Sequence, residues 1–161
     1  MSLGKAVFLD RDGIINRERG FTYKLEEFEI LADVSPALVE LKKRGYRLII
    51  VSNQSGISKG LYTVEDVEML HAHLVAHLKS SGIVLDEVYY CVHHPEQTNC
   101  ICRKPDSLFI EKALSRFSLD AARCYFIGDK ERDKEAAEKA GVKGLLVEAN
   151  TSLLEVIKLI D

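Results

Sequence analysis

Residues 6–13 read AVFLDRDG, a short apolar run followed at once by two aspartates and a glycine. A continuous apolar run of this length is typical of a strand in a parallel sheet, where both faces are covered. The Asp-Arg-Asp-Gly that follows is either a tight turn with Gly13 at positive φ, or a pair of carboxylates that binds a hard cation. The rest of the chain has to decide between these two interpretations.

Short apolar runs of the same kind recur along the chain, and longer segments of helical period separate them. The expected strands are Ala6 to Leu9, Arg47 to Ser52, Glu87 to Cys91, Cys124 to Ile127 and Gly144 to Val147. Alternation of strands and helices is typical of βα units. The sequence therefore predicts an α/β, Rossmann-like fold with a mainly parallel sheet and helices on both faces.

The signals for helix ends are clearest in the first half of the chain. Ser35 is a good helix N-cap, with Pro36 at the first helical position and Gly45 past the end. Thr63 is expected to cap a second helix, which Gly82 ends. Further helices are expected over Ser107 to Phe117, Arg132 to Ala140 and Ser152 to Ile160.

Length and composition favour a single domain over residues 1–161. The chain is 47% apolar, and its formal net charge of -3 arises from 22 basic and 25 acidic residues. No basic stripe indicates nucleic acid or a membrane surface, so a small-molecule partner is expected. The first residues lack the pattern of a signal peptide and no run of 18 apolar residues occurs, so we expect a cytoplasmic protein, and a monomer.

Polar side chains follow the other expected strands at the places where those strands end. In an open parallel sheet, ligands bind outside the carboxyl ends of the strands. The candidates are Ser52, Asn53 and Gln54 after the second strand, Arg103 and Lys104 after the third, and Asp129, Lys130 and Asp133 after the fourth. Each group alone is explained by a polar loop, a surface basic pair or an acidic helix cap. Together they supply the cation ligands and the phosphate donors that phosphoryl transfer requires.

On these motifs the chain resembles the haloacid dehalogenase (HAD) superfamily of aspartate-nucleophile phosphatases. The matching motifs are DRDGI, VSNQ, the lysine of CRKP, and GDKERD, and the resemblance runs from Val7 to about Val147. It implies a HAD-like fold. No stretch between the motifs is long enough for a separate cap domain, so an open cleft is expected.

The resemblance also implies roles for individual residues. Asp10 would be the nucleophile, and Asp12 the acid that protonates the leaving alcohol and then activates water. The residues implied to hold the transferring phosphoryl group are Ser52, Asn53 and Lys104. Mg²⁺ would be bound by Asp10, Asp129 and the backbone carbonyl of Asp12, while Asp133 would orient Lys104 or the metal waters.

Residues 91–102 carry two pairs of soft metal ligands at i and i+2 spacing. Three thiolates and one imidazole, from Cys91, His93, Cys100 and Cys102, make a closed tetrahedral set that is typical of structural zinc. His94 is an alternative to His93, and three buried cysteines with an exposed histidine are the ordinary alternative to a metal. Outside this loop, Cys124 is expected in the core. The histidines of the second helix, His71, His73 and His77, are expected at its surface or edge.

A zinc loop placed before CRKP resembles two groups within the superfamily. One is the D-glycero-D-manno-heptose 1,7-bisphosphate 7-phosphatases of bacterial surface heptose synthesis, and the other is the histidinol-phosphate phosphatases. The motifs NQSGI and GDK favour the heptose group, whereas the short zinc loop and the Asp-Ser-Leu after Lys104-Pro105 depart from it. In the heptose group the implied substrate contacts are Arg103 and Lys130, with Gly20, Phe21 and Thr22 in a specificity loop.

Two non-enzymes remain as alternatives. A phosphorylated signalling receiver fits poorly, because its phosphoacceptor follows the third strand, where this chain has cysteines. A zinc-stabilised binding module without turnover is disfavoured by the presence of all four acidic and basic motif residues, Asp10, Asp12, Lys104 and Asp129.

Overall fold

The structure is a computed structural model that describes residues 2–96 and 99–161. Its centre is a five-stranded sheet in the order β3-β2-β1-β4-β5, in which every pair of neighbouring strands is parallel. The strands are β1 (Ala6–Leu9), β2 (Arg47–Asn53), β3 (Glu87–Cys91), β4 (Tyr125–Gly128) and β5 (Lys143–Leu146). The prediction of an α/β fold with a parallel sheet is therefore confirmed.

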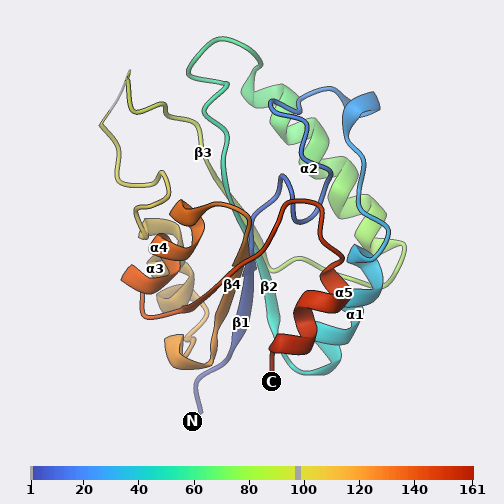
Figure 1. Ribbon diagram of the computed structural model, residues 1–161, viewed down its shortest axis with the longest axis vertical. Helices are drawn as coiled ribbons and strands as arrows, with labels where there is room; N and C mark the ends of the chain where they lie inside the picture. Colours follow the sequence, from blue (N-terminus) through green and yellow to red (C-terminus); the bar gives the residue numbers. More distant parts are fainter. Residues whose placement is uncertain (1, 97–98) are drawn as a thin grey trace.

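Helices cover both faces of the sheet, as Figure 1 shows. The helices are α1 (Val34–Lys43), α2 (Val64–Lys79), α3 (Leu108–Arg116), α4 (Glu131–Lys139) and α5 (Leu153–Val156). The alternation of side chains along a strand divides the core in two. Val7 and Leu9 of β1 pack in a cluster with α1, α2 and α5, whereas Ala6 and Phe8 pack in a second cluster with α3 and α4.

Two of the predicted strands are displaced by one residue. Cys124 was expected to begin a strand, but its N–H bonds to the carbonyl of Ala121 and ends a short 3-10 helix, so β4 begins at Tyr125. The pairing of Tyr125 with Lys143 then moves β5 one residue toward the N-terminus. The side chain of Cys124 is buried, as predicted.

The predicted start of α1 at Ser35 is wrong. The N-cap position is Asp33, and Ser35 lies within the first helical turn. The N–H of Val34 already bonds to the carbonyl of Leu31, and the hydroxyl of Ser152 donates to the Asp33 carboxylate. Pro36 falls at the third helical position, where no intrahelical N–H bond is required. In contrast, Thr63 caps α2 as predicted, in a capping box with Asp66.

The long connection between β1 and α1 carries little regular structure. It contains only the 3-10 helix Leu25–Glu27, and no separate cap domain lies among the residues that the structure describes. No helix in the described part of the chain is long and apolar enough to span a bilayer. In the described part of the chain, the segments that follow the strands at the carboxyl edge of the sheet are thus loops and short turns instead of a folded cap.

Candidate active site

Parallel pairing brings the predicted motifs to one edge of the sheet. Asp10 directly follows β1, and its N–H continues the ladder by bonding to the carbonyl of Ile127 in β4 at 3.0 Å. The loop after β3 is attached to β2 by Asn53. Its side-chain amide donates to the Lys104 carbonyl at 3.1 Å and accepts from the Lys104 N–H at 3.0 Å. Asn53 thus fixes the backbone from which the Lys104 side chain extends.

Lys104 is a fully buried cation at the centre of the site. Its Nζ lies 3.0 Å from Asp10 Oδ1, 2.6 Å from Asp133 Oδ1 and 2.8 Å from the Val51 carbonyl. Burial alone would lower the pKa of Lys104, but the two carboxylates outweigh it and raise that pKa above its usual value. The ammonium group therefore stays charged between two acids.

Asp10 is the acid most affected by its surroundings. Burial raises its pKa to about 7, against the lowering effect of Lys104, and the charges of Asp133 and Asp12 add to the rise. A carboxylate in this position is stabilised by any further cation placed beside it.

Asp12 lies on the other side of the cleft floor, and three side chains hold its carboxylate. Arg11 Nη2 donates to its two oxygens at 2.9 and 3.1 Å, Asn16 Nδ2 donates at 2.9 Å, and Gln54 Nε2 donates at 3.0 Å. The side chain remains 17% exposed toward the cleft. Its orientation is thus fixed while one side stays accessible.

The expectation that His71 lies at the surface or edge of the second helix is wrong. His71 is buried, and its Nε2 lies 3.4 Å from Nη1 of Arg11, whose side chain is fully buried. Burial, followed by the charge of Arg11, lowers the pKa of His71 to about 4. His73 and His77 are exposed, as predicted. Because Arg11 and His71 are 60 residues apart, no local pattern in the sequence signals their contact.

Asp10, Asp129 and Asp133 form an acidic cluster whose ligand atoms all lie within 4.8 Å of one another. The side chain of Asp129 is 1% exposed, and within residues 2–96 and 99–161 its nearest cation, Lys130 Nζ, lies 3.8 Å from Oδ2, beyond hydrogen-bond distance. A Cβ on Gly13 would lie 2.5 Å from Asp129 Oδ2, so the positive-φ glycine allows this close approach. Carboxylate oxygens are the ligands that Mg²⁺ prefers, and a buried carboxylate with few donors, such as that of Asp129, is stabilised by a cation, so the residues present fit that ion.

The cysteine-rich loop brings its four predicted ligands together. The Sγ atom of Cys91 lies 2.9 Å from that of Cys102 and 3.7 Å from that of Cys100. His93 Nδ1 lies 3.3 Å from the sulfur of Cys102 and 3.4 Å from that of Cys91. The ring of His94 points elsewhere, and its Nδ1 accepts the N–H of Glu96. This donor set suits a closed tetrahedral zinc site.

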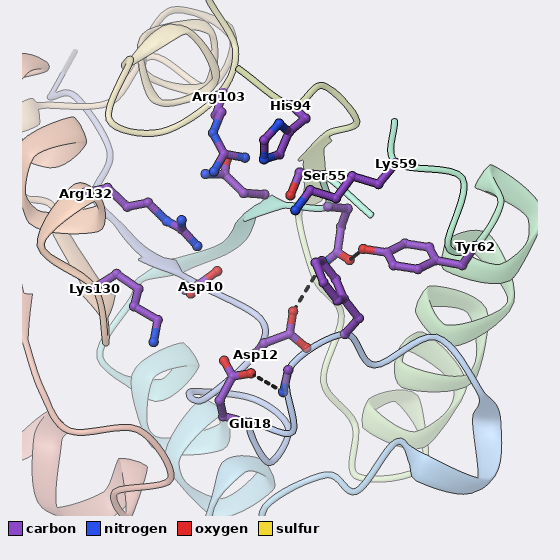
Figure 2. Close-up of a pocket in the computed structure, with 14 residues that line it drawn as sticks. Asp10, Asp12, Glu18, Ser55, Lys59, Tyr62, His94, Arg103, Lys130 and Arg132 are labelled. Carbon is purple, nitrogen blue, oxygen red and sulfur yellow. Dashed lines mark hydrogen bonds between the residues drawn. The ribbon is translucent and has the colours of Figure 1, made fainter. Parts of the chain in front are cut away.

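A cleft of about 310 Å³ opens above these groups (Figure 2). Six of the predicted site residues, Asp10, Asp12, Asn53, Gln54, Arg103 and Lys130, line it together with Gly20 and Phe21 of the expected specificity loop. Ser52 and Thr22 lie beneath the surface. The hydroxyl of Ser52 accepts from Gln54 Nε2 at 2.8 Å, and the carbonyl of Thr22 accepts from Arg11 at 3.1 Å.

The cleft also contains residues that the sequence analysis missed. These are Glu18, Ser55, Lys59, Tyr62, His94 and Arg132. Arg132 stands inside the GDKERD motif, between the predicted site residues Lys130 and Asp133. Its place in the motif could therefore have indicated that it lies at the site. Lys59, Arg103, Lys130 and Arg132 are termed the cationic rim below, and Asp10, Asp12, Lys104, Asp129 and Asp133 are termed the floor.

The fold and the floor define a class of protein. A parallel sheet that presents an Asp-x-Asp after β1, amides after β2, a buried lysine and an acidic pair after β4 is the arrangement of a HAD-type phosphatase. A family model for HAD-hydrolase-like proteins matches residues 101–157.

Comparison with known proteins gives the family within that class. The chain is 41% identical over 145 residues to the D-glycero-beta-D-manno-heptose-1,7-bisphosphate 7-phosphatase of Haemophilus ducreyi, covering 86% of this chain and 80% of the relative. It is 43% identical over 148 residues to the Helicobacter pylori J99 enzyme of the same name, covering 91% and 84%. The chain belongs to this family of heptose-bisphosphate phosphatases, and the prediction of the heptose group is confirmed.

A solved structure supports the same assignment. D,D-heptose 1,7-bisphosphate phosphatase from B. bronchiseptica, complexed with magnesium and phosphate, superposes with a TM-score of 0.85 at 27% identity. The alignment covers 97% of this chain and 87% of that protein. The likeness therefore extends over nearly the whole fold.

Proposed function

We propose that this protein is a magnesium-dependent phosphatase that removes the 7-phosphate of D-glycero-D-manno-heptose 1,7-bisphosphate through a phospho-aspartate at Asp10. The observation that carries the proposal is the buried Lys104, held between Asp10 and Asp133 at the base of a cleft lined by cations. Family membership supplies the substrate, since the relatives are named for the 7-phosphatase reaction, and those at 41% and 43% identity for the beta anomer.

The proposed first step forms a covalent intermediate. A carboxylate oxygen of Asp10 attacks the 7-phosphorus, and the bond from phosphorus to the sugar oxygen breaks. Asp12 donates its proton to that oxygen, so the heptose 1-phosphate leaves as an alcohol. Lys104 neutralises the charge that gathers on the phosphoryl oxygens and on Asp10.

The second step regenerates the enzyme. Asp12, now ionised, takes a proton from a water molecule, which attacks the phosphorus and releases inorganic phosphate from Asp10. The bonds from Arg11, Asn16 and Gln54 keep Asp12 in one orientation through both steps. Gln54 is itself held by the hydroxyl of Tyr62 at 2.7 Å.

The residues that would hold Mg²⁺ are Asp10 and Asp129, with the backbone carbonyl of Asp12 as a further proposed ligand. When bound, the ion supplies positive charge to the transferring phosphoryl group. Asp133 would position Lys104, because its Oδ1 lies 2.6 Å from Lys104 Nζ, and its Oδ2 accepts the N–H of Lys130 at 3.1 Å.

We further propose that Cys91, His93, Cys100 and Cys102 bind a structural zinc ion. The zinc would fix the loop that continues directly into Arg103 and Lys104, which links it to the active site without a role in the chemistry. Reduced cysteine ligands suit a cytoplasmic location. The single sheet with its two helical layers suits one domain over residues 1–161, and we propose that it acts as a monomer.

The test is phosphate release, with Mg²⁺ and with EDTA, from heptose 1,7-bisphosphate and from histidinol phosphate side by side. We expect a large preference in kcat/KM for the heptose, lost in EDTA. A preference for histidinol phosphate would instead identify the protein as a histidinol-phosphate phosphatase that uses the same mechanism. Absence of magnesium-dependent release from both would refute the substrate assignment, and an inactive wild type would favour a binding module.

A further inference from the structure

Two guanidinium groups from different parts of the chain face the same cleft. Arg103 comes from the loop that follows the cysteine ligands, and Arg132 comes from the first turn of α4. Figure 2 shows Arg132 and Lys130 extending toward Asp10 from one side of the cleft, with Lys59 on the other side. The family resemblance implies contacts for Arg103 and Lys130, but it assigns nothing to Arg132.

Both guanidinium groups carry buried N–H donors without partners. Nε of Arg132 and Nη1 of Arg103 are inaccessible to solvent and make no hydrogen bond among the residues described. Native structures leave few buried donors unpaired, and each one has a free-energy cost. The described residues therefore leave the hydrogen-bonding capacity of both guanidinium groups incompletely filled.

The charges in this wall of the cleft are also unbalanced. In residues 2–96 and 99–161 neither arginine forms an ion pair, and the positive charge of Arg132 acts unfavourably on that of Arg103. By comparison, Lys130 Nζ has Asp129 Oδ2 at 3.8 Å, and Lys59 lies over the ring of Phe21. Both arginines line the cleft, so an anion bound between them would relieve their repulsion and accept charge-assisted hydrogen bonds from their cleft-facing N–H groups.

We propose that Arg132, together with Arg103, binds the phosphate that is not transferred, which makes Arg132 a residue that selects bisphosphates over monophosphates. The inference rests on the proposed function, because it takes the second phosphate from the proposed substrate. A phosphate is the fitting anion, since guanidinium groups hold its oxygens with paired, charge-assisted hydrogen bonds. The reacting phosphate has Lys104 and the metal ligands at the floor, so the arginine pair is free for the other one.

The test measures binding, so that it does not depend on turnover. Heptose 1,7-bisphosphate and heptose 7-phosphate are titrated calorimetrically, with Mg²⁺ present, into the Asp10→Asn protein with and without Arg132→Met. We expect Arg132→Met to weaken the bisphosphate by about 10- to 100-fold and the monophosphate by less than about 2-fold. Arg132→Lys should fall between, because it keeps the charge and loses the paired geometry.

Lys139→Gln is the matched control, since it removes a cation from the other end of α4, outside the cleft. It should leave both affinities unchanged. Equal losses for the two sugars, no loss for either, or no binding of the bisphosphate would overturn the role of Arg132. Selective loss of bisphosphate binding, in a protein whose wild type releases no phosphate from that sugar, would refute the proposed function and leave the phosphate site intact.

Discussion

The floor of the cleft and the two arginines of the cationic rim differ in how their charges are paired. In the floor, Lys104 contacts Asp10 and Asp133 directly, so the cation and two acids are paired before any substrate arrives. In the cationic rim, Arg103 and Arg132 line the cleft and form no ion pair with an acid among the described residues. The difference indicates that the reacting groups are preorganised by their own ion pairs. The two arginines, in contrast, would be neutralised only when a negatively charged substrate binds. Changes in the floor should therefore affect every phosphomonoester, and changes in the rim only those with a second anion.

Asp10→Asn should have the largest effect. It preserves the shape of the side chain but removes the nucleophilic carboxylate, so kcat should fall by ~10⁴-fold or more on all phosphomonoesters. Steady-state phosphate release checks this, with Asp106→Asn, an exposed position on the same loop as Lys104, as the control. A variant that kept a tenth of the wild-type rate would rule Asp10 out as the nucleophile.

Lys104→Met should damage both activity and stability. Loss of the cation should lower kcat by ~10²- to 10³-fold, as for other preorganised electrostatic groups. It also leaves two buried carboxylates without their partner, which should cost about 3–5 kcal/mol in the free energy of unfolding. Urea denaturation followed by circular dichroism measures the second effect.

The stability part of that prediction has an internal control. Adding Asp133→Asn to Lys104→Met removes one of the two unpaired acids, so part of the lost stability should return while activity stays low. If the double variant is less stable than Lys104→Met alone, the pairing of Lys104 with Asp133 does not stabilise the fold.

The proposed zinc ion should influence both regions, because the loop that carries its four proposed ligands leads into Arg103 and Lys104. Cys100→Ser should lower the zinc content from one ion per chain and reduce kcat/KM by about 10-fold or more, the scale of an altered metal environment. Atomic absorption and phosphate release measure the two effects. Cys124→Ala is the matched control, because Cys124 is buried away from the loop and should not alter the zinc content. Retention of zinc by Cys100→Ser would refute the ligand assignment.

A change at Asp86, at the end of the sheet opposite the cleft, should leave catalysis unchanged. The Asp86 carboxylate accepts from Lys42 Nζ and the Leu48 N–H at 2.8 Å and from Arg47 Nη1 at 2.9 Å. Burial alone would raise the pKa of Asp86, but these contacts outweigh it and lower that pKa. Asp86→Asn should therefore cost about 1 kcal/mol of stability at pH 7, with kcat and KM unchanged.

The pH dependence of that cost follows from linkage. Because the pKa of Asp86 is lower in the folded protein than its ordinary value of 3.8, ionised Asp86 stabilises the fold at pH values above 3.8. This stabilisation is lost as the pH falls through the pKa of the folded state. The stability difference between wild type and Asp86→Asn should thus be constant near neutrality and shrink in acid. Denaturation at several pH values checks this, and a difference that grows in acid would contradict it.

The sequence predicts the floor well because parallel strands end at a common edge. The motifs after β1, β2 and β4 are far apart in the chain, but pairing rules alone bring Asp10, Asn53 and Asp129 together. The contact between Arg11 and His71 was missed, because it depends on which turn of α2 faces the loop after β1. The start of α1 was misplaced because the chain already turns at Leu31 to Val34, and the N-cap residue Asp33 accepts from Ser152, 119 residues away, instead of from its own helix. Tertiary contacts of this kind leave no local pattern.

The most direct test of the central claim, that the floor transfers phosphate through Asp10, is to trap the intermediate. Wild-type protein turning over heptose 1,7-bisphosphate with Mg²⁺ is quenched in acid, and the phosphorylated peptide is sequenced by mass spectrometry. We predict one phosphoryl group on Asp10, absent without substrate and absent in Asp10→Asn. Phosphoryl label on another residue, or rapid phosphate release with no phosphoenzyme under single-turnover conditions, would contradict the account.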